Sequence, residues 1–481
     1  MRKTKIVCTL GPASRSPEMI EKLLKAGMNV ARMNFSHGTH EYHKETVENF
    51  RTVRDRLGVS AAVLLDTKGP EIRLGNFADD SVMLEDGAEF ILTNRSVSGD
   101  ASAVSVTYAD LPAQLSVGDK VLLDDGNLEL RVESSSDTDI ICTVVHGGKI
   151  SSHKGVNIPG VHIEMPYMSE QDKSDVLFGI ELDVDYIAAS FVRSKDDVIE
   201  LRRFLDYHGG HEIKIISKIE NNEGVDNFED ILKNSDGIMV ARGDMGVEVE
   251  YERLPGIQKR FIKRCRQVGK PVITATQMLE SMISHTSPTR AEINDVANAV
   301  FDGTSAVMLS GETAAGKYPV LAVEAMSRIA AQAEHDCFDM EVYKDQQADV
   351  SAVRRLTREA ICDAACRAAV DLNARAIIAI TRGGSTAISV AKFRPHTPII
   401  GATFRQKTFQ QLSLIWGVTP VLALFQDNTN DLIRHGIDCA KMLDMVSNGD
   451  SVVVTAGVPV GCHEGTNMIK VETVDGNNDC I

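Results

Sequence analysis

The 481-residue sequence has little of what marks several common protein classes. Its nine cysteines are scattered, their number is odd, and no two form a Cys-x-x-Cys pair, so neither a disulfide framework nor a zinc knuckle is indicated. No apolar stretch reaches membrane-spanning length, and Met1–Leu10 lacks the apolar core of a signal peptide. We therefore expect a cytoplasmic protein.

Positive charge is also scarce relative to negative charge. The sequence holds 51 lysines and arginines against 68 aspartates and glutamates, a net charge of −17. Nucleic acids and anionic membranes are therefore poor partners, and an anionic substrate would need a local basic pocket. The hydrophobic and charged fractions, 43% and 25%, are ordinary, and the length allows about two to four domains.

Two stretches of the chain alternate short apolar runs with helical segments. Several helices have clear boundaries, such as the capping box of Thr289 and Glu292 and the stop at Gly303. Eight strands with a helix after each predict a (β/α)8 TIM barrel, whose chemistry lies at the carboxyl ends of the strands. The predicted strands are Lys5–Leu10, Val30–Phe35, Ala61–Leu65, Asp185–Ala189, Ile213–Ile219, Gly237–Ala241, Pro271–Thr276 and Ala306–Leu309.

The pattern changes twice along the chain. Between about residues 74 and 159, short alternating runs and turns such as Asp86-Gly87 predict a small β-barrel domain, inserted after the third strand, that closes over the site as a lid. Beyond Cys337, a polar link (Lys344–Asp349), a long helix (Val353–Leu372) and further strand–helix pairs predict an α/β sandwich. The predicted domains are a catalytic barrel of residues 1–70 and 167–337, a lid of residues 71–166 and a C-terminal regulatory domain of residues 338–481.

The central candidate site follows two neighbouring predicted strands. Lys218 and Glu220 stand two residues apart, so strand alternation points them to the same side. Asp244 follows the next strand, and parallel neighbours bring their carboxyl ends together. Two carboxylates and a lysine suit a divalent cation bound to a phosphorylated substrate, but a structural Lys–Glu pair explains the residues equally well.

A second candidate is the loop Thr381–Thr386, which holds paired glycines and hydroxyls between a strand and a helix. Free backbone amides at a helix start bind anions. A tight turn that needs glycine would show the same residues, so the pattern alone leaves both interpretations open.

Six ordered motifs stand at the predicted strand ends: Arg32–Gly38, Asp66–Arg73, Ile215–Asn221, Ala241–Asp244, Ala275–Met282 and Met308–Thr313. With these motifs the sequence resembles the pyruvate kinase family, bacterial type, across essentially the whole chain. Because the chain stops at Ile481, it resembles the members without the extra C-terminal domain. The resemblance implies phosphoryl transfer from phosphoenolpyruvate to ADP, giving pyruvate and ATP, the last step of glycolysis.

The resemblance also implies roles for the residues of the central site. Glu220 and Asp244 would hold Mg²⁺ or Mn²⁺, and Lys218 would stabilise negative charge in the transition state. The group that protonates the enolate stays open between Thr276 and a water chain that includes Ser310. The implied catalytic residues are Lys218, Arg32 and Thr276, and the implied substrate ligands are Arg32, Lys218, Gly243, Asp244 and Thr276.

A monovalent cation and the nucleotide would bind nearby. In family members without a potassium requirement a lysine stands at the position of Glu71, so Glu71 predicts dependence on K⁺. The implied K⁺ ligands are Asn34, Ser36, Asp66 and Thr67. The implied nucleotide-binding residues are Asn34, Phe35, Ser36, His37, Arg73 and Lys154.

In the family, the loop that matches Thr381–Thr386 holds an allosteric sugar phosphate, which implies effector binding by Thr381, Arg382, Gly383, Gly384, Ser385 and Thr386. Members that respond to fructose 1,6-bisphosphate often carry a tryptophan and an arginine in a late loop, which here reads Ala456–His463 without either. We therefore expect a sugar monophosphate or AMP as effector. The helix that begins at Thr289 lies at a subunit interface in the family, which implies a homotetramer.

Two other interpretations compete with a glycolytic kinase. A Mg²⁺-dependent aldolase or enolate-forming barrel of the lyase class would share the paired carboxylates but would need neither the nucleotide lid nor the monovalent site. A catalytically inactive metabolite sensor would be expected to have lost Lys218, Glu220 or Asp244, and all three are present.

Overall fold

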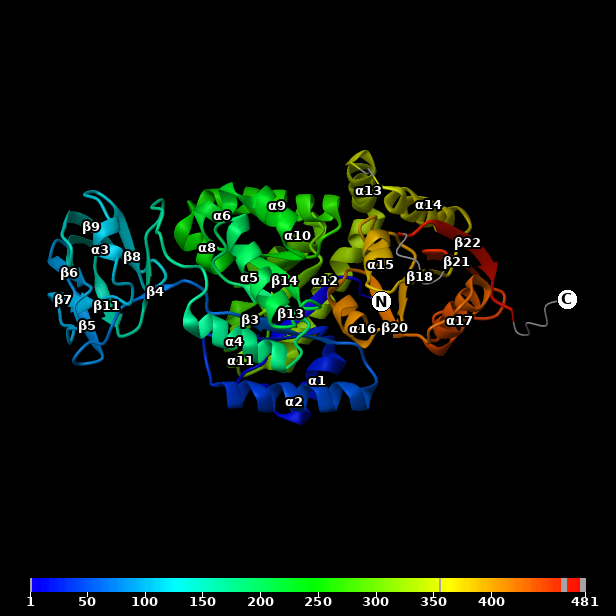
Figure 1. The fold of residues 1–481 in the computed structure, drawn as a ribbon, viewed down its shortest axis with the longest axis horizontal. Coiled ribbons are helices and arrows are strands. Elements are labelled where there is room, and N and C mark those ends of the chain that lie inside the picture. The colour runs from blue at the N-terminus through cyan, green and yellow to red at the C-terminus, as the bar shows by residue number, and fades with distance from the viewer. Residues whose placement is uncertain (1, 354–355, 460–464, 476–481) are drawn as a thin grey trace.

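A closed barrel of eight parallel strands forms the centre of the molecule (Figure 1). The computed structural model describes residues 2–353, 356–459 and 465–475. Each predicted barrel strand is present, and its ends lie within one residue of the prediction. Around the barrel the strands are β1 (Lys5–Thr9), β17 (Ala306–Leu309), β16 (Val272–Ala275), β15 (Gly237–Ala241), β14 (Lys214–Ile219), β13 (Tyr186–Ala189), β3 (Ala62–Asp66) and β2 (Val30–Asn34).

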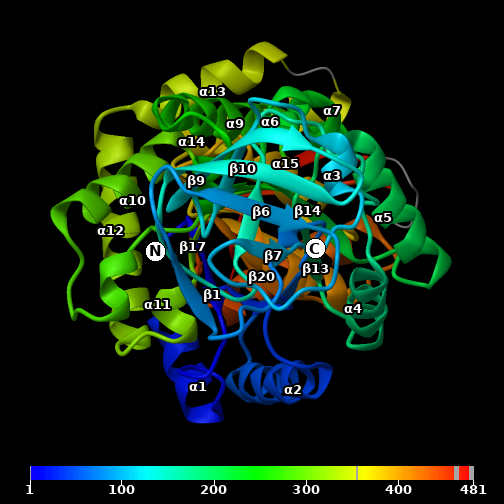
Figure 2. The ribbon, with the colours of Figure 1, turned by 90° about the vertical axis from the view of Figure 1, so that its left-hand side faces the viewer.

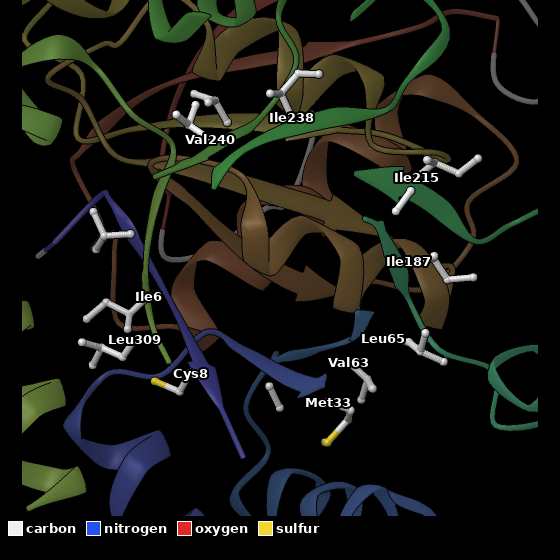
Figure 3. Close-up of a cluster of buried hydrophobic side chains, with 14 of the residues drawn as sticks. Ile6, Cys8, Met33, Val63, Leu65, Ile187, Ile215, Ile238, Val240 and Leu309 are labelled. Carbon is white, nitrogen blue, oxygen red and sulfur yellow. The ribbon is translucent and has the colours of Figure 1, made fainter. Parts of the chain in front are cut away.

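Strand alternation builds two apolar layers on these eight strands. One set of side chains points away from the barrel axis and packs under the helices, as the labelled residues of Figure 3 show. The other set, which includes Val7, Leu64, Ile216 and Met239, forms a separate cluster that fills the barrel. Every second residue therefore faces the barrel interior, and the interior positions nearest the carboxyl ends are free to carry polar groups.

Helices surround the barrel (Figures 1 and 2). The predicted capping box of Thr289 and Glu292 is confirmed at the start of α10, and the helix stops at Gly303, which has a left-handed φ of 93°. The helices of this part are α1 (Pro17–Ala26), α2 (His40–Leu57), α4 (Glu170–Glu181), α5 (Lys195–Tyr207), α6 (Asn222–Asp226), α7 (Phe228–Asn234), α8 (Arg242–Glu248), α9 (Leu254–Val268), α10 (Arg290–Asp302), α11 (Gly311–Ala314) and α12 (Pro319–Asp339).

The segment between β3 and α4 forms a β domain at one end of the molecule, on the left in Figure 1 and toward the viewer in Figure 2. Its main sheet has seven strands in the order β4-β12-β8-β9-β10-β6-β7, and β11 pairs with β5. Its elements are β4 (Ile72–Arg73), β5 (Ser81–Leu84), β6 (Glu89–Thr93), β7 (Ala103–Ser105), α3 (Leu111–Gln114), β8 (Lys120–Leu123), β9 (Leu128–Ser135), β10 (Asp139–His146), β11 (Gly148–Ser151) and β12 (Gly155–Asn157).

A second α/β unit lies at the opposite end of the barrel (Figure 1). Its five-stranded sheet has the order β20-β19-β18-β21-β22, with only β22 antiparallel. Its elements are α14 (Thr357–Asp371), β18 (Ala376–Ile380), α15 (Ser385–Ala391), β19 (Ile399–Thr403), α16 (Gln406–Gln411), β20 (Val418–Leu422), α17 (Thr429–Met442), β21 (Ser451–Ala456) and β22 (Met468–Thr473). The predicted fold class is confirmed, whereas the exact domain boundaries stay a prediction.

The predicted polar link before this unit is wrong. Lys344–Asp349 lies within helix α13 (Val342–Val353), and the following helix begins at Thr357 rather than at Val353. The segment has neither glycine nor proline, and its lysine, glutamine and alanine residues favour a helix. Polarity indicated an exposed link, but Tyr343 and Val350 are buried where α13 packs on α12 and α9.

In the described part of the chain, no helix combines the length and the apolar character that crossing a bilayer requires.

We predict that Thr289→Ala lowers the stability of the fold by about 1 kcal/mol, because the Thr289 hydroxyl caps the Glu292 amide at the start of α10. The midpoint of urea unfolding should fall accordingly. Thr289→Ser keeps the hydroxyl and should unfold near the wild-type midpoint. Equal midpoints for wild type and Thr289→Ala would show that the cap contributes nothing.

Candidate active site

Polar side chains from four adjacent strands meet inside the barrel at its carboxyl end. Asn34 on β2 is in register with Asp66 on β3, and Ala188 on β13 is in register with Asp66 from the other side. On β14, Lys218 and Glu220 continue the inward-facing row of Ile216. Alternation and parallel register therefore bring together residues that lie far apart in the sequence.

Asp66 is the centre of this cluster and is completely buried. Arg32 Nε donates to Asp66 Oδ2 at 2.6 Å, and Lys218 Nζ donates to Oδ1 at 3.0 Å. Burial alone would raise the pKa of Asp66, but the charges of Arg32 and Lys218 more than offset it and hold the pKa below its usual value. Asp66 is therefore a carboxylate that fixes two cations.

Lys218 lies between two carboxylates. Its Nζ is 3.0 Å from Glu220 Oε1 as well as 3.0 Å from Asp66 Oδ1. Burial would lower the pKa of the ammonium, but Asp66 and Glu220 raise it above its ordinary value. The side chain therefore keeps its positive charge at neutral pH.

Glu220 is less well compensated than Asp66. Burial, together with the nearby charge of Asp244, raises its pKa to about 8. Its Oε2 accepts a hydrogen bond from the Phe191 amide at 2.5 Å, whereas its buried Oε1 accepts no hydrogen bond in the described part of the chain. An additional cation beside Glu220 and Asp244 would stabilise the charged form of Glu220 and give its Oε1 a further partner.

Two residues of the cluster were missed in the sequence. Ser190 Oγ lies 2.8 Å from Lys218 Nζ, as acceptor, and 2.6 Å from the Thr67 carbonyl oxygen, as donor. Phe191, which follows it, has a φ of 53° and turns its amide toward Glu220. Alternation along β13 could have found Ser190, since it is two residues beyond the inward-facing Ala188; no pattern indicates the Phe191 amide.

Thr276 and Gly243 are brought together, but they bind each other. The Gly243 amide donates to Thr276 Oγ1 at 2.7 Å, and Thr276 has a φ of 65°. Arg242 holds this turn, because it donates to the Thr276 carbonyl oxygen at 2.7 Å and pairs with Asp295 on α10 at the same distance. Arg242 is therefore a structural partner of a carboxylate and holds the turn in place.

The loop after β2 places the remaining predicted residues of that motif. Asn34 Oδ1 accepts from the Ser36 amide at 3.2 Å, and the Thr67 hydroxyl donates to the Ala188 carbonyl oxygen at 3.3 Å. Phe35 is half-buried against the barrel helices, whereas His37 is exposed. The predicted K⁺ ligands thus stand at the adjacent ends of β2 and β3.

A cleft of about 760 Å³ lies between the barrel and the β domain. Of the predicted site residues, Arg73, Lys154 and Asp244 line it. Arg73 is paired with Glu71 at 2.7 Å, and Lys154 with Asp124 at 2.7 Å. Both cations therefore stand in the cleft wall, each next to a carboxylate.

The C-terminal unit holds a separate cavity of about 570 Å³. Five residues of the predicted effector loop line it, namely Thr381, Arg382, Gly383, Ser385 and Thr386. Gly384 does not line it; its amide donates to Thr381 Oγ1 at 3.0 Å. Aromatic and basic side chains, Phe404, Arg405 and Phe425, complete part of the wall. Of the late loop Ala456–His463, residues 460–463 lie outside the described residues.

Comparison with known proteins identifies matches along nearly the whole chain. Residues 1–323 match the family model described as "Pyruvate kinase, barrel domain", and residues 359–472 match "Pyruvate kinase, alpha/beta domain". A pyruvate kinase of Staphylococcus haemolyticus is 50% identical over 98% of this chain and 81% of that protein. One from Clostridium acetobutylicum is 46% identical over 99% of this chain and 100% of that protein.

We predict that Asp66→Asn destabilises the fold by about 3–5 kcal/mol, because Arg32 and Lys218 lose the buried charge that compensates them. Since the folded pKa of Asp66 lies below the ordinary 3.8, its contribution is present above that pH and is lost as the pH falls through the lowered value. Urea unfolding at pH 7 measures the difference.

Asp206→Asn is the matched control, because Asp206 pairs with the partly exposed Arg202 on the solvent side of α5. It should change stability by less than about 1 kcal/mol. Similar small effects of both substitutions would contradict the central role of Asp66.

Proposed function

Because the chain belongs to the pyruvate kinase family, whose members are phosphotransferases, we propose that it transfers a phosphoryl group from phosphoenolpyruvate to ADP, giving pyruvate and ATP, as the last step of glycolysis in the cytoplasm. One observation carries the proposal for this chain. The Lys218 ammonium and the Arg32 guanidinium are held side by side on Asp66, at the end of the barrel that adjoins the cleft.

Lys218 and Arg32 supply the positive charge that this chemistry needs. Phosphoryl transfer depends on positioning and on neutralising charge more than on covalent catalysis. Both cations are buried, so their interaction with an anionic substrate is weakly screened by water. We assign phosphate binding to Arg32 and stabilisation of the developing enolate to Lys218.

Glu220 and Asp244 fit a divalent cation. Glu220 Oε1 has only the Lys218 ammonium at 3.0 Å and accepts no hydrogen bond in the described part of the chain, and an added cation would compensate both this and the raised pKa of the carboxyl group. Proteins commonly bind Mg²⁺ through one or two carboxylates. The remaining coordination positions of the ion are then filled by oxygens of the substrate and of water. When bound, Mg²⁺ or Mn²⁺ would supply Lewis acidity at the phosphoryl and enolate oxygens.

The carboxylate of the substrate would be bound by the amides of Gly243 and Asp244 and by the Thr276 hydroxyl. In this structure the Gly243 amide donates to the Thr276 hydroxyl, so the two groups already lie next to each other. The substrate carboxylate would replace this hydrogen bond when it binds. The Ser310 hydroxyl is buried without a partner in the described part of the chain, which keeps a water chain through it available as the route of the enolate proton.

Asn34, Ser36, Asp66 and Thr67 would hold K⁺, for which an all-oxygen ligand set is suitable. The nucleotide would enter the cleft between Arg73, Lys154 and the loop of residues 34–37. Glu71 supports the need for K⁺, because its side chain brings negative rather than positive charge to this position and cannot replace the ion. Its carboxylate is paired with Arg73 and Lys68.

We predict that the purified protein forms pyruvate from phosphoenolpyruvate and ADP with Mg²⁺ in K⁺ buffer, and that activity falls at least about tenfold in Na⁺ buffer. Glu71→Lys should reduce this dependence, because its ammonium brings fixed positive charge. Glu85→Lys, an equal change of charge on an exposed residue, should keep it. Full activity of the wild type in Na⁺ would exclude the K⁺ requirement, and no activity in either buffer would favour the sensor interpretation.

We propose that the cavity of about 570 Å³ in the C-terminal unit binds an activating sugar monophosphate or AMP. Support comes from the exposed backbone of Gly383 and the exposed hydroxyl of Ser385 beside Arg382 in its wall. We also propose a homotetramer in which α10 contributes to one subunit interface.

We predict that Ser385→Glu abolishes effector binding, because its carboxylate would repel a phosphate in the same wall of the cavity. Isothermal titration with AMP and with a hexose monophosphate measures affinity directly. Ser447→Glu adds the same charge to an exposed loop of the same unit and should leave the affinity unchanged. Unchanged affinity in Ser385→Glu would place the effector elsewhere.

A further inference from the structure

The short loop between β2 and α2, residues 35–39, carries several of the proposed nucleotide-binding groups. Its start is fixed to the barrel, because the Phe35 amide donates to the Asp66 carbonyl oxygen at 2.9 Å. The rest of the loop leaves the barrel and turns at Gly38, which has a φ of 85°. The hydrogen bond to Asp66 therefore fixes the end of the strand, but it does not fix His37 or the ring of Phe35.

His43, one turn into α2, contacts both parts of this loop. Its Nε2 lies 2.7 Å from the His37 carbonyl oxygen. A carbonyl oxygen only accepts, so Nε2 must carry the proton. His43 is 3% exposed, burial lowers its pKa, and its buried Nδ1 has no partner in the described part of the chain. The side chain is therefore a neutral imidazole in a single defined tautomer.

The imidazole ring also supports Phe35. The two rings are stacked, with centroids 4.1 Å apart and an angle of 12° between their planes. A β-carbon added at Gly38 would lie 3.2 Å from His43 Nε2, so the loop backbone packs closely on the same nitrogen. One side chain thus fixes the loop at a backbone carbonyl and at an aromatic ring.

Helix α4 supports this arrangement from the neighbouring side of the barrel (Figure 2). His40 stacks on Phe178 of α4 at a centroid distance of 4.2 Å, and its Nε2 lies 2.7 Å from Asp175 Oδ1. The Phe178 ring in turn lies 6.2 Å from that of Phe35. The start of α2 is therefore held by α4, and the position of His43 is defined by elements outside the loop.

We infer that His43 is a positioning residue that holds the loop Phe35–Gly38 in the conformation that binds the nucleotide. It does not face the cleft and touches no group that we assign to phosphoenolpyruvate. Its loss should therefore weaken nucleotide binding and leave the binding of phosphoenolpyruvate unchanged. This inference rests on the proposed function, since it assumes that the loop binds ADP.

Two substitutions separate the hydrogen bond from the ring. His43→Phe keeps a ring to stack on Phe35 but has no donor. His43→Gln loses the ring but carries its amide nitrogen at the position that corresponds to Nε2. Thr46→Val is the matched control, because it removes a buried hydroxyl bond to the Tyr42 carbonyl oxygen on the same helix without touching the loop. If His43→Phe does not fold, His43→Asn, whose amide is one bond too short to reach, takes its place.

We expect His43→Phe to raise the KM for ADP about fivefold, the effect of one lost hydrogen bond, with the KM for phosphoenolpyruvate within about twofold of wild type. His43→Gln should recover most of the ADP affinity, and Thr46→Val should behave as wild type. If both His43 variants raise the KM for ADP and leave the KM for phosphoenolpyruvate unchanged, the imidazole ring also contributes to holding the loop. That result would support the inference too.

Unchanged KM for ADP, or an equal change for both substrates, would overturn it. Calorimetric titration of each variant with Mg·ADP gives the same comparison without turnover. A wild type that binds Mg·ADP but forms no pyruvate would contradict the proposed function alone, and only a loss of binding specific to the His43 variants bears on the loop.

Discussion

The burial of the Asp66 carboxylate is the constraint on which the site depends. An ionised carboxyl group without water is costly unless cations and hydrogen bonds compensate it. Here Arg32 on β2 and Lys218 on β14 do so, and β13 stands between β14 and the strand that carries Asp66. The compensation therefore exists only when β2, β3, β13 and β14 are in their correct register, so closing the barrel and assembling the cationic site are the same event.

The negative charge of the cluster is not fully compensated at Glu220. Asp66 has enough positive charge around it to lower its pKa, whereas Glu220 shares Lys218 with Asp66 and faces the charge of Asp244, so its pKa rises to about 8. The buried Oε1 of Glu220 has only the shared Lys218 ammonium, 3.0 Å away, and accepts no hydrogen bond in the described part of the chain. This imbalance favours a cation site over the structural Lys–Glu pair that the residues alone left open.

Local and periodic features could be predicted from the sequence, and long-range contacts could not. The barrel strands follow from apolar runs, and the pairing of Lys218 with Glu220 follows from alternation, because both depend on neighbours in the chain. The contact of Gly243 with Thr276 and the turn of Phe191 depend on the meeting of separate strands and on left-handed backbone at non-glycine residues. The predicted link at Lys344–Asp349 is part of helix α13 instead, because polar residues such as lysine and glutamine favour a helix as readily as they suit an exposed loop.

The two cavities lie at opposite ends of the barrel, which limits how one can act on the other. The C-terminal unit meets the barrel at the amino-terminal ends of its strands, where the Tyr186 hydroxyl donates to the Gln411 carbonyl oxygen at 2.6 Å. Thr408, on the same helix α16, donates to the Arg382 carbonyl oxygen in the proposed effector loop at 3.0 Å. Tyr186 begins β13, and Ser190 follows that strand at its other end. Within one chain, packed residues of α16 and β13 therefore connect the loop Thr381–Thr386 to Lys218, and coupling from the proposed effector site along them would require α16 to have two stable positions on the barrel.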